Sequence, residues 1–255
     1  MSADHLSEIG PCFYPDVRPR RPVYLSGADN AALATLDAHG YDVGLLAQPA
    51  TYDDGKCSRY RAWALDNGCY AAGDMFDPAD WVCWLASFPN PGRTFGNRGS
   101  LYESRLAVPD TGPLQPWGCL FAAAPDVVCD SHKTWTRSAP WFETVRRLGF
   151  PVALVGQNGL EDDPRPWDEC DSWDCLFLGG DTAWKESQEA ADCAREARLS
   201  GKWVHAGRVN SRRRLRLLAG SVDSVDGTFL AYGPDSNATR LASWLDELAG
   251  QAVLL

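Results

Sequence analysis

The sequence predicts an α/β fold in a single domain, a (β/α)8 barrel of the TIM-barrel type, and three observations support this. The chain has 255 residues, which is close to the length of about 250 residues typical of such barrels. Short apolar segments bounded by turn residues recur along it and alternate with segments of helical period. The apolar segments are nearly continuous, as expected for parallel strands buried on both faces. A closed barrel is therefore favoured over a doubly wound open sheet.

Each predicted strand is a short run of apolar residues followed by polar or glycine residues. The eight strands are predicted at residues 23–26, 43–46, 62–66, 119–122, 152–155, 175–178, 203–206 and 224–226. The fourth could extend to Val128. Eight repeats of this pattern match the number of strands that closes a barrel of this class.

Helices are predicted where apolar residues repeat every three or four positions. The clearest covers 183–199, where alanines share one face and Gly201 follows as a stop signal. A second covers 135–148 and ends at Gly149, and a third covers 237–249. No clear helix follows the second strand, which is the weakest part of the barrel pattern.

The rival open sheet lacks its usual sequence signals. Neither the dinucleotide motif GxGxxG nor the phosphate loop GxxxxGK[ST] occurs in the sequence. Residues 89–117 are rich in glycine and proline with little periodicity, so they are predicted to form a long loop or lid. No linker is evident, and the single domain is predicted to span residues 1–255.

Composition limits the class of protein. The formal net charge is 24 − 34 = −10, and no stretch is long and apolar enough for a membrane span. The first residues lack the features of a signal peptide, which predicts a cytoplasmic protein with no membrane partner. Nine cysteines without CxxC spacing predict buried free thiols in a reducing compartment, and neither a zinc site nor another metal or cofactor.

Polar residues follow most of the predicted strands, at the end where barrels of this class carry their chemistry. These segments are 66–70 (DNGCY), Asp126 and Asp130, 156–159 (GQNG), 179–181 (GGD), 205–210 (HAGRVN) and 223–228 (DSVDGT). A single aspartate there could simply cap the next helix. Several carboxylates around one cavity favour chemistry at a sugar anomeric carbon, where one ionised group attacks and another moves protons.

These segments, in this order, resemble the motifs of the tRNA-guanine transglycosylase superfamily, and within it those of the DpdA-type 7-deazaguanine DNA transglycosylases of phages and bacterial DNA-modification clusters. The resemblance covers residues 60–230. It implies that Asp226, in VDSVD, is the nucleophile and that Asp66, in DNGCY, is the general base. The base-binding residues that it implies are Tyr70, which would stack on the base, Asp130 and Gln157, which would read its edge, and Gly179 and Gly180, which would supply a backbone amide.

The sequence departs from this family at several positions. Cys69 and Ala71 replace a glycine and a glutamine of the first motif, and Asn158 replaces a glycine of the fifth-strand motif. The zinc subdomain of tRNA-guanine transglycosylases is missing, because only 255 − 226 = 29 residues follow Asp226 and none is Cys or His. Since that subdomain supports RNA binding, DNA is favoured over tRNA as the substrate.

The resemblance implies a retaining double displacement in which guanine leaves and a 7-deazaguanine base, 7-cyano-7-deazaguanine in the first instance, takes its place through a glycosyl-aspartate at Asp226. Near the proposed nucleophile, Arg208, Arg212, Arg213 and Arg214 are candidates for binding the nucleic-acid backbone. They could equally be a solvated helix face. The sequence does not decide whether a partner protein opens the DNA duplex.

Three other interpretations also remain open. The chain could be a tRNA-guanine transglycosylase, a nucleosidase or glycoside hydrolase using Asp66 and Asp226, or a non-catalytic nucleic-acid-binding paralogue. Release of free base without insertion of a deazapurine would indicate the hydrolase. The presence of Asp66, Asp130 and Asp226 together argues against a purely binding role, which needs no nucleophile.

Overall fold

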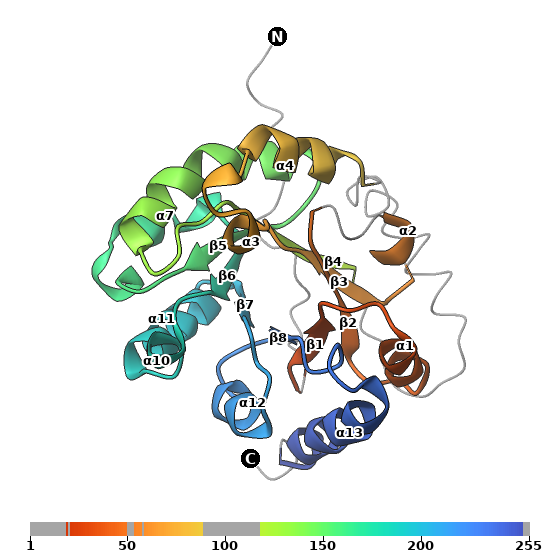
Figure 1. The fold of residues 1–255 in the computed structure, drawn as a ribbon. Helices are drawn as coiled ribbons and strands as arrows, with labels where there is room; N and C mark the ends of the chain where they lie inside the picture. Colours follow the sequence, from red (N-terminus) through yellow and green to blue (C-terminus); the bar gives the residue numbers. More distant parts are fainter. Residues whose placement is uncertain (1–18, 20, 50–53, 58, 89–117, 252–255) are drawn as a thin grey trace.

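The strands of the computed structural model form a closed ring in chain order, each parallel to both neighbours, with helices around the outside (Figure 1). The strands are β1 (Val23–Ser26), β2 (Val43–Ala47), β3 (Ala62–Leu65), β4 (Cys119–Ala123), β5 (Val152–Gly156), β6 (Cys175–Leu178), β7 (Trp203–Ala206) and β8 (Ser224–Gly227). The structure describes residues 19, 21–49, 54–57, 59–88 and 118–251. The ring confirms the predicted (β/α)8 barrel.

The barrel interior is filled by side chains from alternate strand positions, because successive residues of a strand point to opposite faces. The interior cluster is Val23, Leu25, Leu46, Ala62, Ala64, Leu120, Phe121, Ala123, Ala153, Val155, Cys175, Phe177 and Trp203. The intervening residues, such as Tyr24 and Leu154, belong to the layer between strands and helices. Both faces are thus buried, which explains the continuous apolar segments.

The helices lie outside the ring and connect consecutive strands (Figure 1). The α-helices are α1 (Ala31–Ala38), α2 (Asp54–Cys57), α3 (Cys69–Ala72), α4 (Pro78–Ala86), α7 (Ser131–Ser138), α8 (Phe142–Arg147), α9 (Arg165–Asp168), α10 (Thr182–Lys185), α11 (Gln188–Leu199), α12 (Arg212–Leu218) and α13 (Pro234–Gln251). The short 3-10 helices are η2 (Gly73–Met75), η3 (Ala139–Trp141), η4 (Leu160–Asp162) and η5 (Cys170–Ser172).

Two of the predicted helices are each divided in the structure. The segment predicted as 183–199 consists of α10 and α11, because the Ser187 side chain accepts a hydrogen bond from Ala190 N–H and starts a new helix there. The segment predicted as 135–148 is interrupted by η3, which contains Pro140. The third, α13, is longer than predicted. Only the four-residue α2 is described between β2 and β3, in keeping with the weak helical pattern there.

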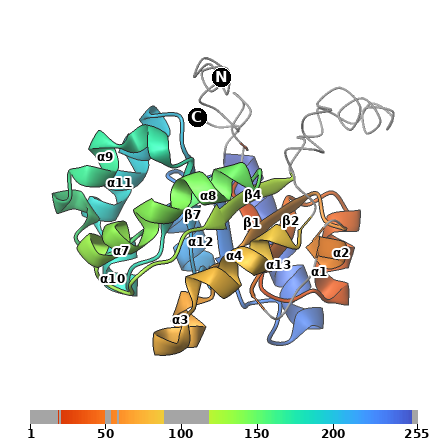
Figure 2. The ribbon, with the colours of Figure 1, turned by 90° about the horizontal axis from the view of Figure 1, so that it is seen from above.

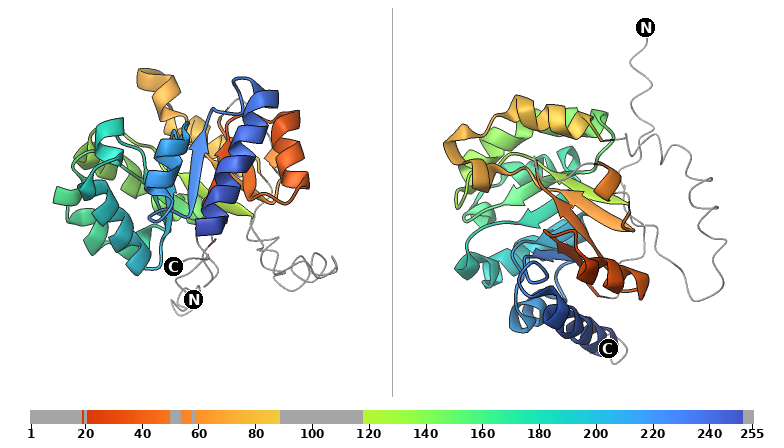
Figure 3. Two further views of the ribbon diagram at one scale, coloured as in Figure 1. Left: turned by 90° about the horizontal axis from the view of Figure 1, so that it is seen from below. Right: turned by 45° about the vertical axis from the view of Figure 1, so that its right-hand side comes forward.

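The helix α3 projects from the face of the barrel where the strands end (Figures 2 and 3). It follows β3 after only three residues, so its side chains lie close to the carboxyl ends of the strands. Strand β4 ends at Ala123 and does not reach Val128. The predicted lid at 89–117 lies outside the described residues.

The described cysteines are not all buried. Cys83 and Cys129 are exposed, and Cys170 is partly exposed, whereas Cys57, Cys69, Cys119, Cys175 and Cys193 are buried. The expectation of buried thiols thus fails for Cys83, on the outer face of α4, and for Cys129, in the loop after β4. No helix within the described ranges is long and apolar enough to cross a membrane.

Candidate active site

Five residues continue the inward-facing strand positions beyond the apolar interior of the barrel. They are Asp66, Gln157, Gly179, Gly207 and Asp226, which follow by two positions the inward residues Ala64, Val155, Phe177, His205 and Ser224. Because side chains two positions apart share a face, these residues converge on the axis at the carboxyl ends of the strands. This mouth of the barrel is the candidate active site.

Asp226 is held at the mouth by two donors. His205 Nε2 lies 3.0 Å from its Oδ1, and the backbone N–H of Arg208 donates to its Oδ2 at 3.3 Å. The Asp226 side chain is 14% exposed, whereas that of His205 is fully buried. Gly207 is required beside them, because a Cβ atom built there would lie 2.7 Å from the Phe177 ring and 3.3 Å from Asp226 Oδ1. The Asp226 carboxylate is therefore anchored from within the barrel and reaches the solvent at the mouth.

Asp66 is a carboxyl group suited to carry a proton near neutral pH. Burial raises its pKa from 3.8 to about 6, and the charges of Asp226 and Asp126 act in the same direction. Hydrogen bonds from the Gly68 N–H and from the Gln48 side chain, at 3.0 Å, oppose the shift. Asp66 and Asp226 are thus close enough for the charge of one to affect the protonation of the other.

A buried polar network lies beside Asp66. Asn67 Nδ2 donates to Asp126 Oδ1 at 2.9 Å, and Gln157 Nε2 donates to Asp126 Oδ2 at 2.6 Å. Gln157 Oε1 in turn accepts from the Cys129 N–H at 2.8 Å. Desolvation raises the pKa of Asp126, although both amide donors oppose this. Asp126 is therefore a buried acceptor tied to strands β3, β4 and β5.

Tyr70 and Arg208 meet across the mouth. The guanidinium carbon of Arg208 lies 4.1 Å from the centre of the Tyr70 ring, a cation–π contact. Tyr70 is 68% exposed on the projecting helix α3. Arg208 has a φ of 61°, an unusual value for a residue other than glycine. This backbone turn lets the Arg208 N–H face Asp226 while its side chain covers the exposed aromatic ring.

Asp130 lies apart from this network. Its side chain accepts the Lys133 N–H at the start of α7, and its carboxylate lies 2.7 Å from Lys133 Nζ. These contacts lower the pKa of Asp130. In this structure Asp130 acts as the helix cap that an aspartate after a strand can provide, and the aspartate joined to Gln157 is Asp126.

The amides of Gly179 and Gly180 both donate to the Gly156 carbonyl, at 2.8 and 3.2 Å. A Cβ atom at Gly179 would lie 2.5 Å from Val155, and one at Gly180 would lie 2.6 Å from Trp184. Close packing alone therefore requires glycine at both positions. Gly179 lies against the Gln157 side chain, 3.0 Å from the position of such a Cβ atom, so it remains part of the mouth.

The arginines of α12 form ion pairs with glutamates. Arg212 pairs with Glu247 of α13 at 2.7 Å, and Arg213 and Arg214 both pair with Glu186, at 2.9 and 3.0 Å. These contacts tie α12 to its neighbours on both sides. Arg208, in contrast, lies at the mouth with Tyr70, so the four predicted phosphate-binding arginines fall into two different environments.

The sequence prediction missed the residues that support Asp226. His205, which the sequence showed only as the first of the polar residues 205–210, is buried against Asp226 and Ser224. The two-residue period of a strand could have indicated this role. Trp203 and His205 are two positions apart and so share the inner face, and the same holds for Ser224 and Asp226. Lys185 was also missed. It is buried, donates to the Gly207 carbonyl at 2.9 Å, and has a pKa lowered to about 8 by burial.

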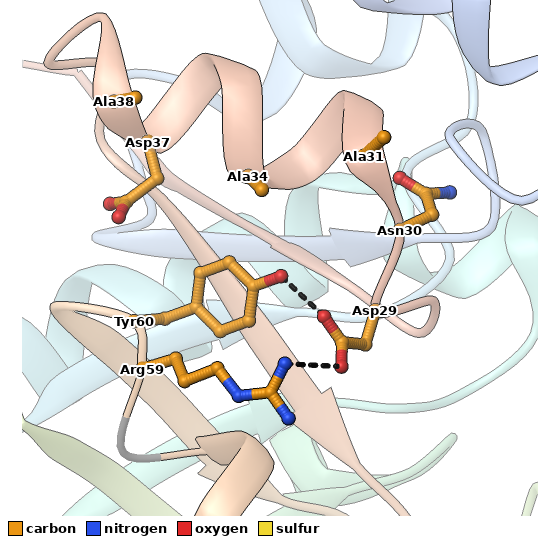
Figure 4. A pocket seen from close by; sticks show the side chains of 8 residues that line it. All are labelled: Asp29, Asn30, Ala31, Ala34, Asp37, Ala38, Arg59 and Tyr60. Carbon is orange, nitrogen blue, oxygen red and sulfur yellow. Dashed lines mark hydrogen bonds and ion pairs between the residues drawn. The ribbon is translucent and has the colours of Figure 1, made fainter.

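A separate hollow of about 410 Å³ lies between α1 and the segment before β3 (Figure 4). Its polar side chains contact one another: Tyr60 donates to Asp29 at 2.6 Å, and Arg59 lies 3.8 Å from the other Asp29 oxygen. None of its lining residues belongs to the mouth. Among the described residues, no group of three or more His, Cys, Asp or Glu side chains could hold a metal ion.

No protein-family model matches the chain, and no curated protein matches it. Solved structures that are similar to it include two mutant tryptophan synthase alpha-subunits from Pyrococcus furiosus, each 14% identical, with TM-scores of 0.49 and 0.48. A chain of the tryptophan synthase a2b2 complex of the same organism is 16% identical, with a TM-score of 0.43. Each alignment covers 91% of this chain and 99% of the other. These likenesses concern the barrel fold and assign no activity to this chain.

Proposed function

We propose that this chain is a base-exchange transglycosylase that replaces guanine in DNA with a 7-deazaguanine base through a covalent glycosyl-aspartate. One observation carries the proposal: Asp66, with a pKa of about 6, lies within electrostatic reach of Asp226, whose carboxylate is anchored by His205 and the Arg208 amide. A proton carrier and a fixed carboxylate close together at the mouth of the barrel are the two groups that retaining chemistry at an anomeric carbon requires.

In the first step, an Asp226 oxygen attacks the anomeric carbon of the target nucleotide. A carbon–oxygen bond forms, the bond from that carbon to guanine N9 breaks, and the electron pair leaves on the base. Asp66 in its protonated form gives its proton to the departing guanine. A pKa near 6 leaves a usable fraction of Asp66 protonated at neutral pH.

The second step reverses these roles with a different base. The Asp66 carboxylate takes the N9 proton of the incoming 7-deazaguanine, and the freed nitrogen attacks the anomeric carbon. The bond to Asp226 breaks and the carboxylate is restored. No external oxidant or reductant is needed, because the leaving and entering groups are bases of the same kind.

The base would be held by the network around Asp126. Its carboxyl group is buried and fixed by Asn67 and Gln157, which suits an acceptor for the amino and imino hydrogens of a guanine edge. Asp126 therefore replaces Asp130 in this role within our proposal. Tyr70 stays 68% exposed beside Arg208, so its ring offers a surface on which a flat base could stack.

For the substrate, we propose a single-stranded or flipped nucleotide of DNA, because Asp226 at the mouth could not reach a sugar inside a stacked duplex. Arg208, whose backbone N–H binds Asp226 and whose guanidinium lies at the Tyr70 ring, would meet a phosphate of this nucleotide. The glutamate partners of Arg212, Arg213 and Arg214 reduce the positive charge of α12, so these arginines contribute less to the proposed contact.

The test is incubation of the purified protein with a single-stranded guanine-containing oligodeoxynucleotide, or with tRNA, and 7-cyano-7-deazaguanine. Mass spectrometry of the digested nucleosides should show the deazaguanine nucleoside in DNA, with an equal amount of free guanine. Modified tRNA with unmodified DNA would overturn the substrate assignment. Guanine release without insertion would identify a nucleosidase, and no release from either substrate would remove the catalytic proposal.

A further inference from the structure

A chain of hydrogen bonds runs through the barrel interior and ends at Asp226. Trp203 Nε1 donates to Ser224 Oγ at 2.8 Å, Ser224 Oγ lies 2.8 Å from His205 Nδ1, and His205 Nε2 lies 3.0 Å from Asp226 Oδ1. Trp203, Ser224 and His205 are each fully buried. Their strands are adjacent, with His205 directly opposite Ser224 in the β7–β8 register.

The two ends of this chain fix its direction. An indole N–H can only donate and an ionised carboxylate can only accept. The Ser224 oxygen therefore accepts from Trp203, which leaves its hydroxyl hydrogen free to donate to His205 Nδ1. The remaining imidazole hydrogen then lies on Nε2 and donates to Asp226. Every donor in the chain has an acceptor only when His205 is neutral and carries its hydrogen on Nε2.

The surroundings of His205 favour this neutral form. The rings of Phe121 and Phe177 lie 4.8 and 4.5 Å from the imidazole, and Lys185 contributes a positive charge. Burial lowers the pKa of His205, although the charge and hydrogen bond of Asp226 oppose this.

We propose that His205 is a positioning residue for Asp226, held as the Nε2–H tautomer by Ser224 and Trp203. This inference rests on the proposed function, in which Asp226 is the nucleophile. His205 acts through Asp226 and contacts no substrate. By holding Oδ1 it fixes the carboxylate plane, which directs Oδ2, the oxygen with the longer contact to the Arg208 N–H, toward the anomeric carbon.

Three variants test this role, with activity measured as base exchange in single-stranded DNA. His205→Leu removes the donor and should lower kcat on the order of 100-fold with little change in KM, a loss comparable to that of other orienting partners. His205→Gln keeps an N–H donor and should restore a large part of that loss. Ser224→Ala removes the hydroxyl that donates to His205 Nδ1, so the Nε2–H tautomer is no longer fixed, and kcat should fall about tenfold.

The matched control is Ser26→Ala, which removes an equally buried strand serine whose side chain bonds to the Ala28 backbone. It should leave kcat unchanged. Thermal unfolding of each variant separates a lost fold from a lost orientation. Full kcat in folded His205→Leu, or equal losses in the Gln and Leu variants, would overturn the positioning role.

A second readout does not depend on activity. Long-range 15N NMR of the imidazole groups in the wild-type protein should show a His205 that is neutral from weakly acid to neutral pH, with its hydrogen on Nε2. The same spectrum of Ser224→Ala should show a mixture of tautomers. An Nδ1–H or doubly protonated His205 would overturn the inference even if base exchange is found. A correct tautomer in a protein without exchange would instead remove the proposed function and leave the tautomer assignment in place.

Discussion

Gln157 Nε2 donates a 2.6 Å hydrogen bond to Asp126 Oδ2, which joins the amide after β5 to the carboxylate after β4. Asn67 donates to the other oxygen, so neither oxygen of this buried carboxylate lacks a donor. Its charge reaches Asp66 and raises the pKa of that residue. The relationship ties the base-reading and proton-moving parts of the proposed site into one unit.

Asp126→Asn should therefore impair both stability and base binding. The NH₂ group of the new asparagine must face another N–H donor, either Asn67 Nδ2 or Gln157 Nε2. This clash of donors costs about 1–3 kcal/mol of unfolding free energy. Loss of the charged acceptor should raise the KM for the deazaguanine by about 10-fold or more. Denaturant unfolding and steady-state exchange measure the two effects.

The matched control for this variant is Asp130→Asn. Asparagine caps a helix about as well as aspartate does, so stability and KM should change little. A raised KM in Asp130→Asn together with an unchanged KM in Asp126→Asn would assign the base contact to Asp130 instead.

Asp226→Asn should abolish base exchange. The amide occupies the same space but cannot form the glycosyl ester, and loss of a nucleophile costs on the order of 10⁴-fold or more in rate. Incubation with DNA in the absence of an incoming base, followed by mass spectrometry of the intact protein, should show a covalent adduct for wild type and none for the variant. Exchange by Asp226→Asn at an appreciable rate would remove Asp226 from the mechanism.

The fold was predictable because its signal is repeated along the chain. The apolar runs of β1, β5 and β6 are continuous because strands of a parallel sheet are buried on both faces. The polar residues after each run mark where that strand ends. Element lengths were less predictable, because local features decide them. The Ser187 cap divides one predicted helix. Strand β4 ends shortly before Pro125, whereas the sequence pattern allowed it to extend to Val128.

The candidate site was only partly predictable. That Asp66 and Asp226 lie at the same end of the barrel follows from their positions at strand ends, which the sequence reveals. The choice between Asp126 and Asp130 does not, because both follow β4 and only the path of the loop decides which one meets Gln157. The partners of the α12 arginines were equally hidden, since Glu186 lies between α10 and α11 and Glu247 lies on α13.

The raised pKa of Asp66 predicts a pH dependence of stability. The folded protein binds this proton more tightly than the unfolded chain, so the free energy of unfolding should fall as pH rises from 3.8 to about 6 and then level off. Asp66→Asn removes the buried charge and should flatten this part of the curve, which urea unfolding at several pH values will show. If Asp66→Asn leaves the pH dependence of the unfolding free energy unchanged, the group that binds this proton is not Asp66.

The same group should set the pH dependence of the first chemical step. Guanine release in a single turnover needs protonated Asp66, so its rate should fall as pH rises through about 6. Attack by the incoming base needs the Asp66 carboxylate and should show the opposite trend. Rapid-quench measurement of each half-reaction distinguishes them, and a first step independent of pH across this range would exclude Asp66 as the acid.

Chelation should leave both fold and activity intact. The described residues hold no group of three or more His, Cys, Asp or Glu side chains suited to a metal ion, and the proposed mechanism uses carboxylates alone. The midpoint of thermal unfolding and the exchange rate should be the same before and after EDTA treatment. Stoichiometric zinc in elemental analysis, lost together with activity, would contradict this prediction.

Arg208 should contribute more to DNA binding than any arginine of α12. Arg213 is 77% exposed but pairs with Glu186, so its charge is already partly neutralised, whereas the Arg208 guanidinium lies on an uncharged ring at the mouth. Removing a phosphate contact reduces the dependence of log affinity on log salt by about one unit. Arg208→Ala should show this change with single-stranded DNA, and Arg213→Ala a much smaller one.

Fluorescence anisotropy over a range of salt concentrations measures both slopes, and the triple variant of Arg212, Arg213 and Arg214 to alanine extends the comparison. That variant should lose unfolding free energy, because it removes the ion pairs that tie α12 to Glu186 and Glu247. Its effect on the salt slope should stay below that expected for three lost contacts. A slope reduced by about three units would instead show that these arginines leave their glutamates to bind phosphates, and α12 would then be the main DNA-binding surface.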